Sequence, residues 1–173
     1  EITGPLAAKL YVSSTTNDCD LFVTMQAHSP KGREVFFQGT VDPKTPLAQG
    51  WLRVSHRKLN TELSKPWRPF HTHDDKQLLT PGKIYEVDIE IWPQCIVLPK
   101  GFTIALNISG QDFDRPGPSV QAYSESRGSG PFLHDHPLDR PKDVFGGNTT
   151  IYTGPKYSSY LLVPIIPKRR RKI

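Results

Sequence analysis

The sequence predicts an all-β domain, and three observations support that prediction. Pro (17) and Gly (13) are abundant and spread through the 173 residues, which a helical bundle does not tolerate because Pro removes a donor and clashes inside a helix. Short runs of β-branched and aromatic residues alternate with turn signals. Hydrophobic residues are 36% and charged residues 23% of the chain, which is ordinary for one soluble domain with a real core.

The N-terminal half contains four segments with strand-like composition. The expected strands are 6–14, 20–27, 34–40 and 50–58. The turn signal Ser29-Pro30-Lys31-Gly32 joins the second and third into a hairpin. The fourth alternates apolar and polar residues with an imperfect phase, and a polar loop at 60–79 follows it. Ordered loops of this length are often functional or interfacial.

The clearest strand of the chain is expected at 84–92. Its apolar residues Val87, Ile89 and Ile91 lie on one face, because side chains alternate along a strand. Glu86, Asp88 and Glu90 share the other face, which admits a metal or acid–base interpretation, although a solvated strand face explains them more simply.

Further strand-like runs follow at 95–98, 102–109, 149–153 and 157–166, with an irregular region at 112–138. About eight short strands separated by turns indicate a sandwich or a barrel. We expect one domain over residues 1–167, a jelly-roll β-sandwich of two packed antiparallel sheets.

The net charge of +5 comes from residues 168–173, which hold two Lys and three Arg and are expected to form a disordered tail. The body is therefore neutral, and the sequence argues against nucleic acid as a partner. No apolar stretch approaches the roughly 18 residues of a membrane span. Cys19 and Cys95 are too few for a disulfide framework and are expected as buried free thiols, which favours a cytoplasmic location without deciding it. The abrupt start in strand-like sequence is typical of a fragment of a longer protein.

The sequence contains no local signature of catalysis. Gly-x-Ser-x-Gly is missing, and both Ser109-Gly110 and Gly128-Ser129-Gly130 are typical of turns. No sequence pattern pairs any of the six His with a neighbouring nucleophile. We expect no catalytic residues and no cofactor.

Although we expect no catalytic residues, two binding hypotheses remain open. His71 and His73, and likewise His134 and His136, are spaced so that each pair projects to one side of an extended segment; together they suggest a four-ligand metal site, against the simpler interpretation of loop packing. Three Trp, at positions 51, 67 and 92, suggest a stacking platform for a free-standing carbohydrate-binding module. Aromatic residues are not enriched, however, and Trp92 fits core or rim packing.

Several segments in order resemble the C-terminal domain of X-Pro dipeptidyl-peptidases and CocE/NonD serine hydrolases. The first two match the patterns G-x-x-x-x-x-L-x-V-S-S and D-x-D-x-F-V. The matching segments are Gly4–Ser14, Asp18–Val23, Ser29–Glu34, Gly50–Arg57, Leu79–Ile89, Val97–Leu106, Ser109–Phe113 and Ser159–Pro167. Each is weak alone, and their common order makes the resemblance specific.

The resemblance implies a galactose-binding-like jelly roll that carries no catalytic residue. It implies an upstream α/β-hydrolase domain as the partner within the same parent chain, a role in shaping the substrate cleft, and in some relatives a homodimer. Esters, amides or X-Pro peptides would be the parent's substrates. Residues 114–141 form a longer segment than in many relatives, so the substrate preference stays open.

Candidate contacts with the catalytic domain lie in the 60–79 loop and around Asp112. Because an interface is more apolar than ordinary surface, we expect Trp67, Phe70 and Phe113 to be exposed. The complete candidate set is Arg53, His56, Trp67, Phe70, His71, His73, Asp112 and Phe113.

Overall fold

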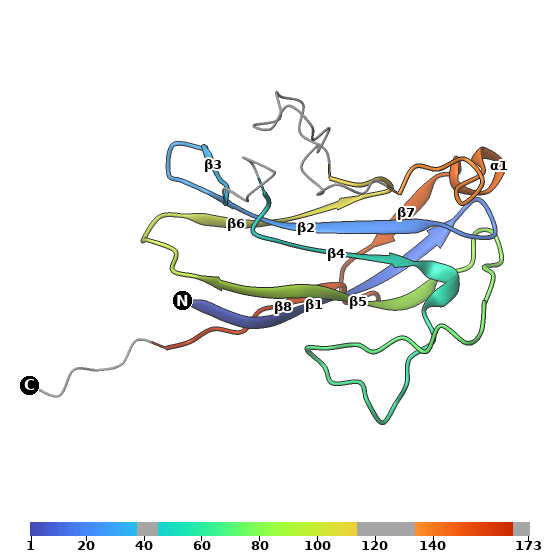
Figure 1. Cartoon of the computed structure of the whole chain (residues 1–173), viewed down its shortest axis with the longest axis horizontal. Coiled ribbons are helices and arrows are strands. Elements are labelled where there is room, and N and C mark those ends of the chain that lie inside the picture. The colour runs from blue at the N-terminus through green and yellow to red at the C-terminus, as the bar shows by residue number, and fades with distance from the viewer. Residues whose placement is uncertain (38–44, 114–133, 168–173) are drawn as a thin grey trace, which may run out of the picture.

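Two antiparallel sheets face each other in the computed structural model, which describes residues 1–37, 45–113 and 134–167 (Figure 1). One sheet is built on β1 (Ile2–Ser14), which pairs with β5 (Tyr85–Ile96), β7 (Thr149–Tyr152) and β8 (Tyr160–Leu162). The other is built on β2 (Asp20–His28), which pairs with β3 (Glu34–Val35), β4 (Ala48–Arg53) and β6 (Thr103–Ser109). The prediction of an all-β fold with two antiparallel sheets is confirmed.

The core lies between the sheets and comes from the inward faces of the long strands. Leu6, Leu10 and Val12 of β1 pack there with Val23 and Ile89, all essentially inaccessible to solvent. Within β5 the predicted alternation is confirmed. Val87, Ile89 and Ile91 are buried, while the outward Glu86 and Asp88 both pair with Lys9 of β1. These two acids are therefore part of a solvated strand face.

The expected hairpin forms, with Ala27 opposite Val35 and His28 opposite Glu34. Residues 38–40 of the expected strand lie outside the described part of the chain, as does the tail 168–173. In the described residues, helix is limited to the 3₁₀ turn η1 (Val54–His56) and the short α1 (Lys142–Phe145).

Three strand predictions were too long. The strand expected at 34–40 ends at Val35, and Phe36 and Phe37 lie outside β3. The strand expected at 50–58 ends at Arg53, because Val54 N–H donates to the Cys19 carbonyl and Ser55 N–H to Asp18, which turns the chain into η1. The strand expected at 157–166 is observed only as β8 at Tyr160–Leu162. Residues 157 and 159 donate backbone hydrogen bonds within the preceding turn. Beyond Leu162, contact with β1 is reduced to the isolated bridge between Ile2 and Ile165 and the bond from the Thr3 N–H to the Pro164 carbonyl.

The prediction that both thiols are buried is wrong for Cys95. Cys19 is buried and free, and burial raises its pKa to about 11. Cys95 is free and exposed. The pairing register between β1 and β5 shifts between Gly4 and Leu6 of β1. As a result, the side chains of Trp92 and Pro93 both point outward. Gln94 then takes the inward position and Cys95 faces solvent.

Candidate functional site

A pocket of about 430 Å³ opens where β4 of one sheet meets β5 of the other. β4 supplies Trp51 and Arg53, β5 supplies Glu90 and Trp92, and η1 supplies His56. The two strands approach so closely that only a residue without a side chain fits at Gly50, beside the Glu90 backbone. The meeting of the two sheets therefore builds the pocket.

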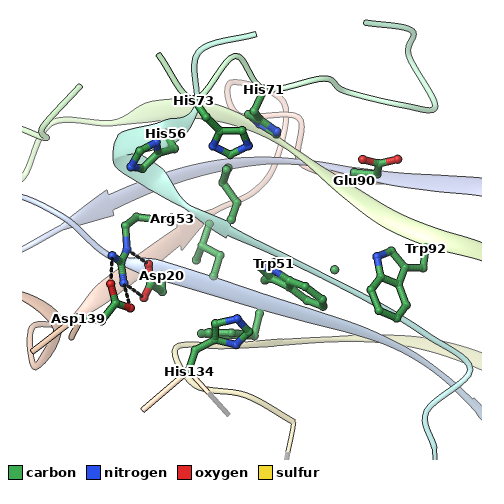
Figure 2. Close-up of a pocket in the computed structure, with 14 residues that line it drawn as sticks. Asp20, Trp51, Arg53, His56, His71, His73, Glu90, Trp92, His134 and Asp139 are labelled. Carbon is green, nitrogen blue, oxygen red and sulfur yellow. Dashed lines mark hydrogen bonds and ion pairs between the residues drawn. The ribbon is translucent and has the colours of Figure 1, made fainter. Parts of the chain in front are cut away.

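Aromatic rings line the pocket wall formed by the sheets. Trp51 and Trp92 contact each other edge to face, with ring centroids 5.3 Å apart. His134 tilts against Trp51 at 5.5 Å and against Phe22 at 5.7 Å. Figure 2 shows Trp51, Trp92 and His134 on one side of the pocket and the loop histidines His71 and His73 on the other.

An ion-pair network closes one end of the pocket. The Arg53 guanidinium donates two hydrogen bonds to the buried Asp20 and two to Asp139, all 2.9 to 3.0 Å long (Figure 2). These bonds raise the pKa of Arg53 and lower the pKa of Asp139. Arg140 adds an ion pair to Asp20 at 2.9 Å. The network ties the segment after residue 134 to the outer face of β2 and β4.

Three imidazoles cluster on the loop side of the pocket. His73 lies between His56 and His71, with ring centroids 5.6 and 6.1 Å away. His56 Nδ1 and His71 Nε2 are buried without a hydrogen-bond partner. Burial, followed by the neighbouring His73, lowers the pKa of His71, against an opposing hydrogen bond to the Asp88 backbone. The surroundings of His71 thus favour its neutral imidazole.

This cluster predicts acid sensitivity of the domain. Since the pKa of folded His71 lies below the ordinary value of 6.5, the unfolded chain binds this proton more readily. The stability contribution is complete above about pH 6.5 and is lost as the pH falls from there through the lowered folded pKa. Urea unfolding of the wild type and of His71→Gln at pH 7.5 and 5.5 measures this. We expect a smaller acid loss in the variant, whereas equal losses in both proteins would contradict it. His136→Gln, at an exposed position, is the control.

The predicted site residues fall in three places. Arg53, His56, His71 and His73 line the pocket. Asp112 and Phe113 line a second pocket of about 210 Å³ on the outer face of β2 and β6, where Asp112 accepts hydrogen bonds from the His134 backbone and ring. Trp67 and Phe70 lie on the loop, outside both pockets.

The predicted exposure holds for two of the three aromatic residues. Trp67 is 49% and Phe70 39% exposed. Phe113 lines the second pocket and is half-buried, so that part of the prediction is wrong.

The four-histidine metal site does not form. In residues 1–37, 45–113 and 134–167, no group of three or more His, Cys, Asp or Glu side chains could hold a metal ion. His134 is turned toward Asp112 and Trp51, and His136 is exposed outside the pocket, where its Nδ1 accepts from the Leu138 N–H.

Sequence reasoning missed Glu90 and Asp139 as pocket residues and considered Trp51 and Trp92 only as a sugar platform or as packing. The alternation along β5 could have indicated Glu90 and Trp92, because it places both side chains on the outward face of the strand. Trp92 is 54% exposed and lies on the rim. Asp139 is far from β4 in sequence, and no local pattern links it to Arg53.

Comparison with known proteins identifies the domain. The family model described as the X-Pro dipeptidyl-peptidase C-terminal non-catalytic domain matches residues 1–162. The chain belongs to this family. The resemblance inferred from the sequence is confirmed, and the family is described as a non-catalytic domain.

Similar proteins include hydrolases. A crystal structure of a CocE/NonD family hydrolase from Staphylococcus aureus superposes with a TM-score of 0.81 at 31% identity, covering 96% of this chain and 28% of that one. A cocaine esterase from Rhodococcus sp. is 24% identical over 97% of this chain and 24% of its own length. A putative serine esterase from Mycobacterium tuberculosis is 28% identical over 71% of this chain and 20% of its own. The chain thus spans about a quarter of the length of these relatives.

Within the described residues, no helix is long and apolar enough to cross a membrane.

Proposed function

We propose that this chain is the accessory C-terminal domain of a serine hydrolase, which packs against an α/β-hydrolase catalytic domain in the same longer protein and shapes its substrate cleft. Membership of the non-catalytic family carries the proposal, and the esterases and CocE/NonD hydrolases among the similar proteins support it. Hydrolysis of esters or amides is the activity that we assign to the longer protein. A free-standing carbohydrate-binding module gains no support from these similarities.

We assign the jelly-roll arrangement to the sandwich. The chain changes sheets after β1, β4, β5 and β6, so sequential strands are divided between the two layers. This alternation favours a jelly roll over a simple meander.

The 60–79 loop is the surface that we assign to the catalytic domain. Its own hydrogen bonds order it. Asn60 N–H donates to the Phe70 carbonyl, Phe70 N–H to Ser64 Oγ, and Lys65 and Arg68 exchange backbone bonds. Leu79 is buried and anchors the end of the loop through its bond to the Asn17 carbonyl. An ordered loop loses little conformational entropy when it docks, so its exposed Trp67 and Phe70 are suited to an interface.

The interface proposal predicts the effect of a double substitution. Trp67→Ser with Phe70→Ser removes the two exposed aromatic side chains of the loop without touching the core. In the longer protein, we expect a loss of at least about tenfold in kcat/KM for an aryl ester or an X-Pro anilide, since one or two buried aromatic anchors contribute several kcal/mol to a protein interface. The isolated chain should keep its melting temperature.

Hydrogen exchange provides the direct test of contact. The backbone amides of residues 60–79 should exchange more slowly in the longer protein than in the isolated chain. Val97→Ser is the matched control, because Val97 is a 70% exposed apolar residue outside the loop. If exchange is the same in both proteins and the double variant behaves like Val97→Ser, the loop is not the interface.

A further inference from the structure

Three carboxylates and one guanidinium line the pocket between β4 and β5. The carboxylates belong to Asp20, Glu90 and Asp139, and the guanidinium belongs to Arg53. A carboxylate in a partly enclosed pocket attracts cations when no cation of the protein already neutralises it.

Two of these carboxylates are already neutralised. Asp20 and Asp139 each accept two hydrogen bonds from Arg53, and Arg140 adds a second cation to Asp20. Glu90 differs from both of them. Its nearest cation in the described part of the chain is the Arg68 guanidinium, with Nε 3.7 Å from Oε1, and both side chains are largely exposed. A pair at that distance and exposure contributes little to stability.

Glu90 lies next to exposed aromatic surface. Trp92 follows it by two residues on the same outward face of β5, and Trp51 contacts Trp92 from β4. The two indoles are 54% and 42% exposed, and His134 adds a third ring beside Trp51. Figure 2 shows the Glu90 carboxylate and the two indoles around the same opening.

We propose that this corner of the pocket binds a small organic cation, an alkylammonium or guanidinium group. The cation would contact the Trp51–Trp92 pair on one side and the Glu90 carboxylate on the other. Indole rings are the best aromatic partners for cations, and the carboxylate supplies the counter-charge. Arg68 occupies the Glu90 side of the site loosely and acts as an internal competitor. A pocket of about 430 Å³ has the size of small-molecule sites. The proposal does not depend on the hydrolase function. Its two indoles and Glu90 belong to β4 and β5, whereas Trp67 and Phe70 lie on the loop outside the pocket.

Choline and its neutral isostere 3,3-dimethylbutan-1-ol test the proposal on the chain of residues 1–173. Titration is followed by the indole N–H signals of Trp51 and Trp92 in NMR spectra. We expect choline to bind at least about fivefold more tightly than the isostere, the minimum for a cation held by an aromatic face and a carboxylate. Equal affinities, or no shift with tens of millimolar choline, would overturn the proposal. Preferential binding of a neutral hexose would overturn it in favour of a sugar site.

Matched variants separate the site from general charge effects. Glu90→Gln should weaken choline binding about fivefold. Glu86→Gln, on the same face of β5 but paired with Lys9 outside the pocket, should leave it unchanged. Arg68→Ala should strengthen binding about twofold by removing the competitor. Trp92→Leu should weaken binding, whereas Trp67→Leu should not. Equal effects of Glu90→Gln and Glu86→Gln would exclude a site at Glu90.

Discussion

Gly50→Ala is expected to destabilise the domain by about 3 kcal/mol, or to prevent its folding. A Cβ added at Gly50 would lie 2.0 Å from the Glu90 carbonyl oxygen and 3.0 Å from its carbonyl carbon. Both are backbone atoms of the central part of β5, so no side-chain rotation relieves the clash. The two sheets would have to separate where β4 contacts β5, which also opens the pocket. Urea unfolding followed by tryptophan fluorescence measures the change.

Gly110→Ala is the matched control for this substitution. Gly110 has no atom within 4 Å of an added Cβ, and its backbone does not need the left-handed conformation. Its stability should remain within about 0.5 kcal/mol of the wild type. If Gly50→Ala is as stable as Gly110→Ala, β4 and β5 do not approach as closely as the structure indicates.

Arg53→Ala is expected to cost about 3 kcal/mol, since removal of one partner leaves a buried charge without compensation. The affected charge is Asp20, whose side chain is only 6% exposed and would retain Arg140 alone. The substitution also removes the contact of the guanidinium with the Phe145 ring, 4.5 Å from its centroid. Segment 134–145 should then exchange its amide protons faster than in the wild type.

Two further variants define the cause of this loss. Arg53→Lys keeps the charge but cannot make paired hydrogen bonds to two carboxylates, so we expect an intermediate loss. Lys58→Ala removes an exposed ion pair with Asp74 and should not change the melting temperature measurably. An Arg53→Ala protein as stable as Lys58→Ala would show that the network does not stabilise the domain.

Most strands were predictable because their signals are local. The alternation of Val87, Ile89 and Ile91 with acids identifies both a strand and its buried face, and the Ser29–Gly32 turn identifies the hairpin. Strand ends were less predictable. The end of β4 depends on the bonds from Val54 and Ser55 to Cys19 and Asp18, which lie in the connection between β1 and β2.

The pocket was predictable only in part. Its loop histidines and Arg53 were predicted as candidate site residues because they are charged or polar and lie in or near a long loop. Trp51, Glu90 and Asp139 come from three different segments of the chain. They meet only because β4 contacts β5 and because Arg53 holds the segment after residue 134. The metal hypothesis failed because spacing along the chain says nothing about which partner, Asp112 or a metal ion, each imidazole faces.

By itself, the sequence determined the fold class, the identity of the long strands, the lack of a local catalytic signature and the resemblance to a non-catalytic domain family. These follow from periodicity, turn chemistry and ordered motifs, which are properties of neighbouring residues. Only the tertiary structure decided which strands share a sheet, that Cys95 faces solvent, and that two tryptophans and Glu90 line one pocket. Each of these depends on contacts between residues far apart in the chain, because packing of the two sheets brings them together.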